Sequence, residues 1–244
     1  MQTPSRSRAA QTPSPDYGVD GPGFVIGLLS GGAVLVASGA ALRKFGAPKL
    51  GVALLTVGAI ALVPGALGLL YVKRGKYRHR DRLLDRIRWR GDEHTLDIGT
   101  GGGLLLVGAA KRAPAGRAFG VDTWSRRDLS GNTCERAMRN ARIEGVADRV
   151  EIRNEDARKL SFPDESFDVV VSMLCIHNIE EPGRQEALRE AVRVCKAGGT
   201  VLISDLADTA GYAATFRELG LTTVRTAPFA DTFPPQRIVE ARKP

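Results

Sequence analysis

The stretch that decides the fold of the polar part of the chain is Leu96-Asp97-Ile98-Gly99-Thr100-Gly101-Gly102-Gly103-Leu104. An apolar run with an acidic residue leads through closely spaced glycines into a second apolar run. This pattern predicts a buried strand, a tight turn and the first turn of a helix. Backbone N–H groups in such a turn can approach a ligand closely. The stretch therefore predicts a ligand site, although a purely structural strand-to-helix turn would favour the same glycines.

Outward from this loop, strand-like and helical stretches alternate. The seven expected strands are His94–Ile98, Ala118–Val121, Arg149–Arg153, Phe167–Ser172, Thr200–Ser204, Leu221–Arg225 and Arg237–Ala241. The expected helices between them are Leu104–Arg112, Gly131–Glu144, Gly183–Cys195 and Ala210–Leu219. Several strands are apolar on both faces, which is typical of parallel strands covered by helices. We expect an α/β fold with a Rossmann-like, mostly parallel sheet, helices on both faces and a ligand site at the carboxyl ends of the strands.

Acidic residues follow two more of the expected strands. Asp122 comes 25 residues after Asp97, at a position where a carboxylate can accept the hydroxyl protons of a ribose. Asp156 and Ala157 follow the third strand, where a carboxylate can accept from an adenine amino group. Leu104 stands where a dinucleotide fingerprint needs another small residue, and no Gly-Lys-Ser/Thr of a Walker loop follows.

In this order and at this spacing, the motifs resemble those of the class I S-adenosylmethionine-dependent methyltransferases, in their small-molecule branch. Asp97-x-Gly99-x-Gly101-x-Gly103 resembles the first motif of the family, and Phe167-Asp168-Val-Val-Val-Ser resembles the fourth. Lys196-Ala197-Gly198-Gly199 resembles its Lys-Pro-Gly-Gly turn, with Ala in place of Pro. The resemblance implies S-adenosylmethionine as cofactor and seven strands, one of them antiparallel. It also implies a set of cofactor-binding residues: Asp97, Gly99, Gly101, Gly103, Asp122, Asp156 and Ala157.

The acceptor region is expected after the fourth strand, at Met173-Leu174-Cys175-Ile176-His177-Asn178. The Asn/Asp-Pro-Pro-Tyr/Phe motif of methylases that act on planar amino groups does not occur there. The apolar Leu174 and Ile176 suit a lipophilic or aromatic acceptor. His177 is the candidate general base; a loop histidine bonded to backbone is the alternative. Asp205, at the end of the fifth strand, could face the same site.

Two stretches without a charge precede this region. Residues 23–42 and 50–72 are each long enough, as helices, to cross the roughly 30 Å core of a bilayer. Core helices are usually amphipathic and shorter, and the apolar part of a signal peptide has only about 7–15 residues. The pair predicts a transmembrane hairpin, residues 23–72, after a disordered tail, residues 1–22. A basic linker, residues 73–93, then leads to a methyltransferase domain, residues 94–244.

The net charge of +8 and the pI of about 9.7 would suggest a nucleic-acid partner. However, residues 43–49 contribute three of the positive charges and residues 73–95 the other five, whereas residues 96–244 are neutral. The charge therefore indicates topology. Positive residues beside a span stay on the cytoplasmic side, so we expect a two-span membrane protein with a cytoplasmic domain and no nucleic-acid partner.

The expected partners are a small-molecule acceptor and the bilayer. Gly23, Gly27 and Gly31 recur at four-residue spacing, a pattern that lets helices pack closely. They predict contact between the two spans or, alternatively, a homodimer through the first span. The three scattered cysteines have no C-x-x-C pair and no histidine at metal-ligand spacing, so no metal site is expected.

The sequence favours a membrane-anchored methyltransferase that acts on a small, lipophilic or aromatic acceptor. Two alternatives stay open at this point. One is an NAD(P)-dependent oxidoreductase on a Rossmann-type sheet. The other is a non-catalytic protein that binds S-adenosylmethionine and serves as a membrane partner.

Overall fold

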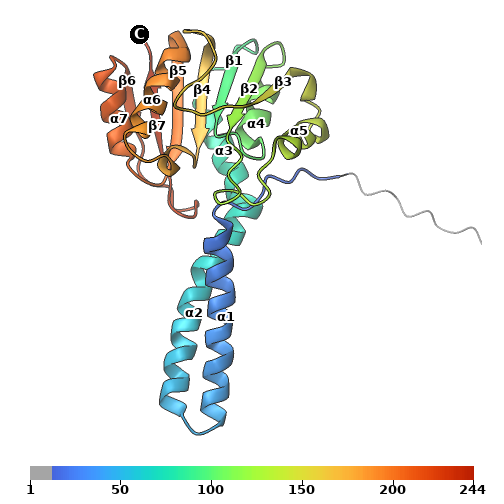
Figure 1. Cartoon of the computed structure of the whole chain (residues 1–244), viewed down its shortest axis with the longest axis vertical. Coiled ribbons are helices and arrows are strands. Elements are labelled where there is room, and N and C mark those ends of the chain that lie inside the picture. The colour runs from blue at the N-terminus through green and yellow to red at the C-terminus, as the bar shows by residue number, and fades with distance from the viewer. Residues whose placement is uncertain (1–12) are drawn as a thin grey trace, which may run out of the picture.

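The structure, a computed structural model, describes residues 13–244. It consists of a pair of long helices and an α/β unit that sits at one end of the pair (Figure 1). The disorder expected of residues 1–12 lies outside the described residues.

The α/β unit is built on a seven-stranded sheet in the order β3-β2-β1-β4-β5-β7-β6. The strands are β1 (His94–Ile98), β2 (Arg117–Asp122), β3 (Val150–Asn154), β4 (Phe167–Met173), β5 (Cys195–Asp205), β6 (Thr222–Arg225) and β7 (Arg237–Arg242). β1 to β5 pair in parallel, and β7 runs antiparallel to both of its neighbours. The predicted mostly parallel, Rossmann-like sheet is confirmed.

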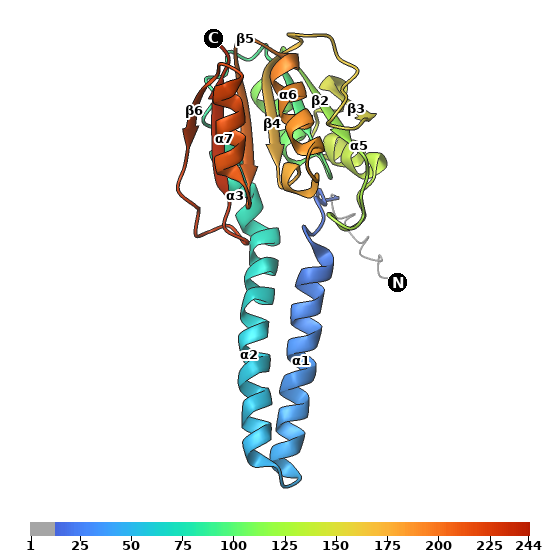
Figure 2. The ribbon, with the colours of Figure 1, turned by 60° about the vertical axis from the view of Figure 1, so that its left-hand side comes forward.

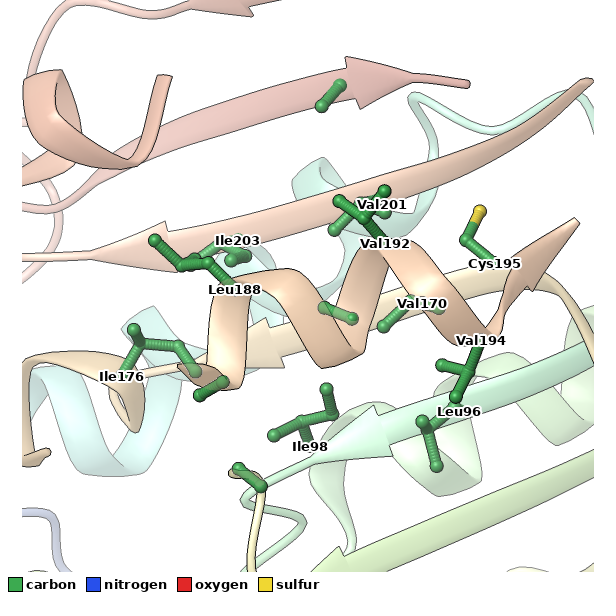
Figure 3. Packing of buried hydrophobic residues seen from close by; sticks show 14 of the residues in the cluster. Leu96, Ile98, Val170, Ile176, Leu188, Val192, Val194, Cys195, Val201 and Ile203 are labelled. Atoms are coloured by element: carbon green, nitrogen blue, oxygen red, sulfur yellow. The ribbon is translucent and has the colours of Figure 1, made fainter. Parts of the chain in front are cut away.

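Helices cover both faces of the sheet because β4 is apolar on both sides. Val170 packs with α6 (Gly183–Val194) and α7 (Thr209–Glu218), as Figure 3 shows for Leu188 and Val192 of α6. Alternate residues of β4 face the other side. There they pack with α3 (Lys76–Leu84) and α4 (Leu104–Arg112), and α5 (Cys134–Ile143) packs beside α4.

The two long helices are α1 (Pro22–Lys44) and α2 (Pro48–Leu70). Their mean hydropathy is 2.0 and above, and only 17% of each apolar window is buried. The helices project from the sheet as an isolated hairpin (Figure 2). Large apolar side chains cover its outside, among them Phe24, Ile26, Val34, Val57, Ile60 and Val63. The core helix of a soluble protein would be mostly buried, and these helices are not.

The hairpin is held together by glycines at a spacing of seven residues. A Cβ on Gly32 would lie 3.0 Å from the carbonyl oxygen of Gly58, and one on Gly39 would lie 2.6 Å from that of Gly51. Gly23, Gly27 and Gly31 meet no described residue within 4 Å. The prediction that this line joins the two spans is therefore wrong. A seven-residue repeat stays on one seam between two long helices, whereas a four-residue repeat drifts away from it.

The predicted basic linker is largely helical. α2 continues through a π turn (Tyr71–Gly75) into α3, so that one helix runs from Pro48 to Leu84. Leu83 and Leu84 are fully buried against the sheet. The few apolar residues are scattered among nine basic ones and give a weak periodic signal, which is why charge alone suggested a linker.

Part of the tail that the sequence predicted to be disordered is bound to the α/β unit. We call residues 16–21 the strap. Asn140, on α5, is fully buried; its side chain accepts from the Asp16 N–H (2.9 Å) and donates to the Asp16 carbonyl (2.7 Å). Val19 N–H donates to Ser130 Oγ (2.8 Å). Pairing with a distant loop gives no local sequence signal, so the strap could not be predicted.

Candidate active site at the carboxyl edge of the sheet

A cavity of about 1020 Å³ lies at the carboxyl ends of β1, β2 and β4. This is the edge that faces the hairpin, as the direction of the β4 arrow shows (Figure 1). The glycine loop and the segments after β2, β3 and β4 line the cavity, together with the strap and the first turn of α1. Its volume is at the upper end of the roughly 300–1,000 Å³ of small-molecule sites. The cavity therefore has room for more than one small ligand.

The structure brings most of the candidate residues from the sequence together at this cavity. Among the candidate residues, those that line the cavity are Asp97, Gly99, Gly101, Asp122, Asp156, Ala157 and His177. Gly103 does not line it. With φ of 86° it is the N-cap of α4, and it lies against Ala137 instead.

Asp97 is buried at the end of β1. One of its oxygens, Oδ2, accepts from Thr100 Oγ1 (2.8 Å) and from the backbone N–H of Leu106 (3.0 Å). It thereby caps an otherwise unpaired N–H in the first turn of α4. Burial raises the pKa of Asp97 to about 7, although these two hydrogen bonds oppose the shift. An added cation in the cavity would favour the ionised form.

The glycine loop brings distant segments together. At Gly99 (φ 72°) a Cβ would overlap the sulfur of Cys175, and at Gly102 it would lie 3.0 Å from Cα of Tyr17 in the strap. These two positions need glycine because other parts of the chain approach so closely. The loop is thus packed between the acceptor region and the strap.

Asp122 organises the loop that follows β2. Its carboxylate accepts from the backbone N–H of Gly101 (2.8 Å), the backbone N–H of Trp124 (2.6 Å) and the side chain of Asn132 (3.2 Å). A carboxylate has about four acceptor positions, so one further donor can be accommodated. The Trp124 side chain does not line the cavity.

Asp156 lies at the cavity wall beyond β3. It accepts from the backbone N–H of Arg158 (2.9 Å) and from its guanidinium group (3.0 Å). The hydrogen bonds with Arg158 lower the pKa of the Asp156 carboxyl. Asp156 therefore stays ionised and can accept a further hydrogen bond.

His177 lines the cavity and pairs with Asp205, which is buried behind it and does not line the cavity. The ring Nδ1 of His177 lies 2.5 Å from Oδ1 of Asp205, and its backbone N–H donates to Oδ2 (3.0 Å). Asp205 is completely buried and also accepts from Tyr212 Oη (3.3 Å). The imidazole, 20% exposed, thus has its Nδ1 beside a buried carboxylate that also anchors the His177 backbone. Nε2 has no hydrogen-bond partner among residues 13–244 and is available to a ligand.

Two features of the cavity escaped the sequence analysis. The strap and the buried Lys76 of α3 both line it. Lys76 Nζ donates to the carbonyls of Tyr17 (3.0 Å) and Gly18 and lies 3.7 Å from Asp20 Oδ2. A lysine in a basic run usually faces solvent. Only the fold shows that this one is enclosed by the strap.

The family of the α/β unit follows from its sequence and its fold. A family profile described as a methyltransferase domain matches residues 95–199, which contain the glycine loop, Asp122 and the segment after β4. Residues 95–199 therefore form a methyltransferase domain. S-adenosylmethionine, the cofactor expected from the sequence, agrees with this domain.

Curated relatives support the same assignment. The methyltransferase domain is similar to phosphatidylethanolamine N-methyltransferase of Cereibacter sphaeroides, with 35% identity over 51% of this chain and 55% of that protein. It is also similar to a ubiquinone/menaquinone biosynthesis C-methyltransferase of Ruegeria sp., with 32% identity over 51% of this chain and 46% of that protein. The chain spans about half the length of the curated relatives it matches.

A solved structure confirms the fold of the methyltransferase domain. The S-adenosylmethionine-dependent methyltransferase from Aquifex aeolicus superimposes with a TM-score of 0.57, covering 73% of this chain and 97% of that one. The two sequences are 18% identical, so the likeness concerns the fold alone.

Proposed function

We propose that this protein is a membrane-anchored methyltransferase that transfers a methyl group from S-adenosylmethionine to a lipophilic acceptor. The observation that carries the proposal is that one cavity is lined both by the glycine loop and by Phe24 and Val25, in the first turn of α1. The methyl-transfer site and the base of the exposed apolar hairpin thus share a wall.

The residues present fit the cofactor. S-adenosylmethionine supplies a methyl group that is already activated by a positively charged sulfur, so the protein mainly has to orient the reactants and exclude water. We assign Asp97 to the cationic amino group, and the glycine loop that leads into α4 to the carboxylate. Asp122 takes a ribose hydroxyl group, and Asp156 with Ala157 takes the adenine.

We assign His177 as the base that removes a proton from the acceptor. Asp205 lies at Nδ1, which leaves Nε2 without a partner among the described residues, and His177 lines the cavity. A buried carboxylate that orients an imidazole also stabilises the imidazolium formed after proton uptake, as in other histidine–carboxylate pairs. Asp205 acts as a positioning residue in this scheme.

The hairpin is assigned to a bilayer. Each helix has 23 residues, about 35 Å of helix, which matches a bilayer core of roughly 30 Å. Where α2 leaves this region, Lys73, Arg74 and Arg78 are exposed and pair with no described carboxylate. Positive charges in this position favour the cytoplasmic side. Gly23, Gly27 and Gly31 leave an open face on α1, and a homodimer through that face stays a prediction.

Two relatives support a lipophilic acceptor. The name of one refers to phosphatidylethanolamine, and the name of the other refers to ubiquinone/menaquinone biosynthesis. Both kinds of compound reside in membranes. The apolar residues after β4 in this chain agree with such an acceptor.

A binding and activity screen tests the proposal. The full chain in detergent is titrated with S-adenosylmethionine and with NAD, and then incubated with methyl-labelled cofactor and fractionated membrane lipids, quinones, water-soluble amines or nucleic acid. We expect binding of S-adenosylmethionine alone and label in a lipid or quinone fraction. Binding of NAD instead would indicate an oxidoreductase. Cofactor binding without label in any fraction would indicate a non-catalytic partner.

A further inference from the structure

The wall of the cavity changes character from the sheet towards the hairpin. At the sheet, carboxylates and backbone N–H groups of the cofactor loop dominate. At the hairpin end, the lining includes the apolar Phe24, Val25, Leu206, Phe233 and Pro234, beside the strap and Lys76. The cofactor-binding residues all lie at the polar end, so the apolar end is left for a different ligand.

The apolar end is continuous with the outside of the hairpin. Phe24 is 60% exposed although it lines the cavity, and it stands in the first turn of α1. On the other side, Phe233 lies beside Gly68, in the last turn of α2. The two phenylalanines come from segments over 200 residues apart, and each one stands at the domain end of one of the two membrane helices.

This arrangement gives an acceptor a defined direction. His177 and Cys175 line the cavity next to the glycine loop, whereas Phe24 and Phe233 line it next to the hairpin. An amphiphile that enters from the bilayer would have its polar end at His177 and its chain along the apolar wall. Moving a long apolar chain through water instead would be unfavourable in proportion to its length.

We propose that the gap between Phe24 of α1 and the Phe233–Pro234 turn is a binding site for the apolar chain of a membrane lipid, through which the acceptor reaches His177 laterally from the bilayer. This inference rests on the proposed function, because it gives the bound lipid the role of methyl acceptor. It adds that the hairpin forms part of the acceptor site as well as the anchor.

Photolabelling of the full chain tests this route. The protein is reconstituted into phosphatidylcholine vesicles that contain one of two probes. The first is phosphatidylethanolamine with a diazirine on its headgroup, and the second is phosphatidylcholine with a diazirine at the end of an acyl chain. We expect the headgroup probe to label residues 173–179 and the chain probe to label Phe24, Phe233 and their neighbours, as mapped by peptide mass spectrometry.

A matched pair of variants makes the test specific. Phe24→Ser removes an exposed phenylalanine at the cavity, and Phe45→Ser removes one that is 79% exposed at the far end of the hairpin. Phe24→Ser should lower headgroup labelling of residues 173–179 at least several-fold, and Phe45→Ser should leave it unchanged. No headgroup labelling of residues 173–179, or equal effects of the two variants, would overturn the proposal.

Methyl transfer measured on the same vesicles and on vesicles made with membrane lipid extract separates this inference from the proposed function. Labelling of residues 173–179 without methyl transfer to any lipid would support the lateral route and contradict the assignment as a lipid methyltransferase. Methyl transfer without that labelling would support the enzyme assignment and overturn the lateral route.

Discussion

Oδ1 of Asp205 lies 2.5 Å from Nδ1 of His177, and the two residues come from different segments at the carboxyl edge of the sheet. Asp205 ends β5, which is fixed by its neighbours β4 and β7 on both sides. The carboxylate is therefore held rigidly by the sheet, and it orients a histidine that belongs to a short 3₁₀ turn.

The first prediction concerns this pair. His177→Gly should lower turnover by about 10²–10⁴-fold, the usual contribution of a general base, and leave the dissociation constant of S-adenosylmethionine unchanged. Added imidazole should restore part of the turnover. Asp205→Asn should lower turnover less and keep cofactor affinity. A His177→Gly enzyme with normal turnover would remove the base from the mechanism.

A second prediction concerns the ribose assignment. Asp122→Ala removes a charged acceptor, and hydrogen bonds to charged groups contribute about 1.5–3 kcal/mol. We expect the dissociation constant of S-adenosylmethionine, measured by calorimetry, to rise roughly 10–100-fold. Asp164→Ala, which removes a 75% exposed carboxylate outside the cavity, is the control and should bind normally. Equal affinities in the two variants would argue against the role of Asp122.

The third prediction links stability to pH. The pKa of Asp97 is raised from 3.8 to about 7, so the folded chain keeps a proton that the unfolded chain has lost. The stabilising effect of this bound proton is full below about pH 4 and is lost as the pH rises through 7. Compared with the wild type, Asp97→Asn should therefore increase the free energy of unfolding more at pH 8 than at pH 5, and the two increases should differ by on the order of 3 kcal/mol. The same substitution should weaken cofactor binding.

Asp168→Asn is the control of opposite sign for Asp97. Hydrogen bonds with Lys196, the His94 N–H and Arg90 lower the pKa of Asp168 despite its partial burial. Its removal should therefore destabilise the protein at pH 8 more than at acid pH. Urea titrations at both pH values measure the two effects. The Asp97 interpretation fails if both variants change in the same direction.

A fourth prediction concerns the strap. Asn140 holds Asp16 through two hydrogen bonds and also donates to the carbonyl of Gly102 in the cofactor loop (2.8 Å). Asn140→Ala should cost about 2–3 kcal/mol, because it leaves buried backbone groups without partners. Proteolysis between residues 13 and 21 should become faster. The exposed Asn154→Ala should change neither quantity, and identical proteolysis of both variants would mean that Asn140 does not hold the strap.

The fifth prediction concerns the hairpin seam. Gly58→Val places a side chain against Gly32 and Val36, where a Cβ already lies within 2.9 Å of their atoms. Overpacking of this kind costs about 1–3 kcal/mol. Gly27→Val, in open space on α1, is the matched control. Circular dichroism during SDS titration of the micelle-bound protein should show earlier unfolding for Gly58→Val alone, and equal midpoints would contradict the observed seam.

The sequence predicted what depends on local patterns. β1 and α4 have the expected bounds because the motif from Leu96 to Leu104 fixes strand, turn and helix together. β5 starts at Cys195, five residues earlier than expected, because pairing with β4 draws the glycine turn into the sheet. Apolar periodicity gives no information about such pairing.

The remaining errors involve contacts between segments far apart in the sequence. The importance of Asp205 depends on His177, which lies 28 residues before it. The strap depends on Asn140 and Lys76, and the enclosure of Lys76 contradicts its charged sequence environment. The hairpin seam depends on which of several glycine repeats faces the partner helix, and this is set by the packing of two helices together.

The unbroken helix from Pro48 to Leu84 has a mechanical consequence. Since α2 passes through the π turn into α3 and Leu83 and Leu84 are buried against the sheet, the hairpin and the methyltransferase domain are joined by one continuous helix. Under the proposed function, the height and tilt of the domain above the lipid surface then depend on how well the hairpin matches the hydrophobic thickness of the host membrane. Bilayer composition would thus control how deeply the cofactor site stands over its supply of acceptor.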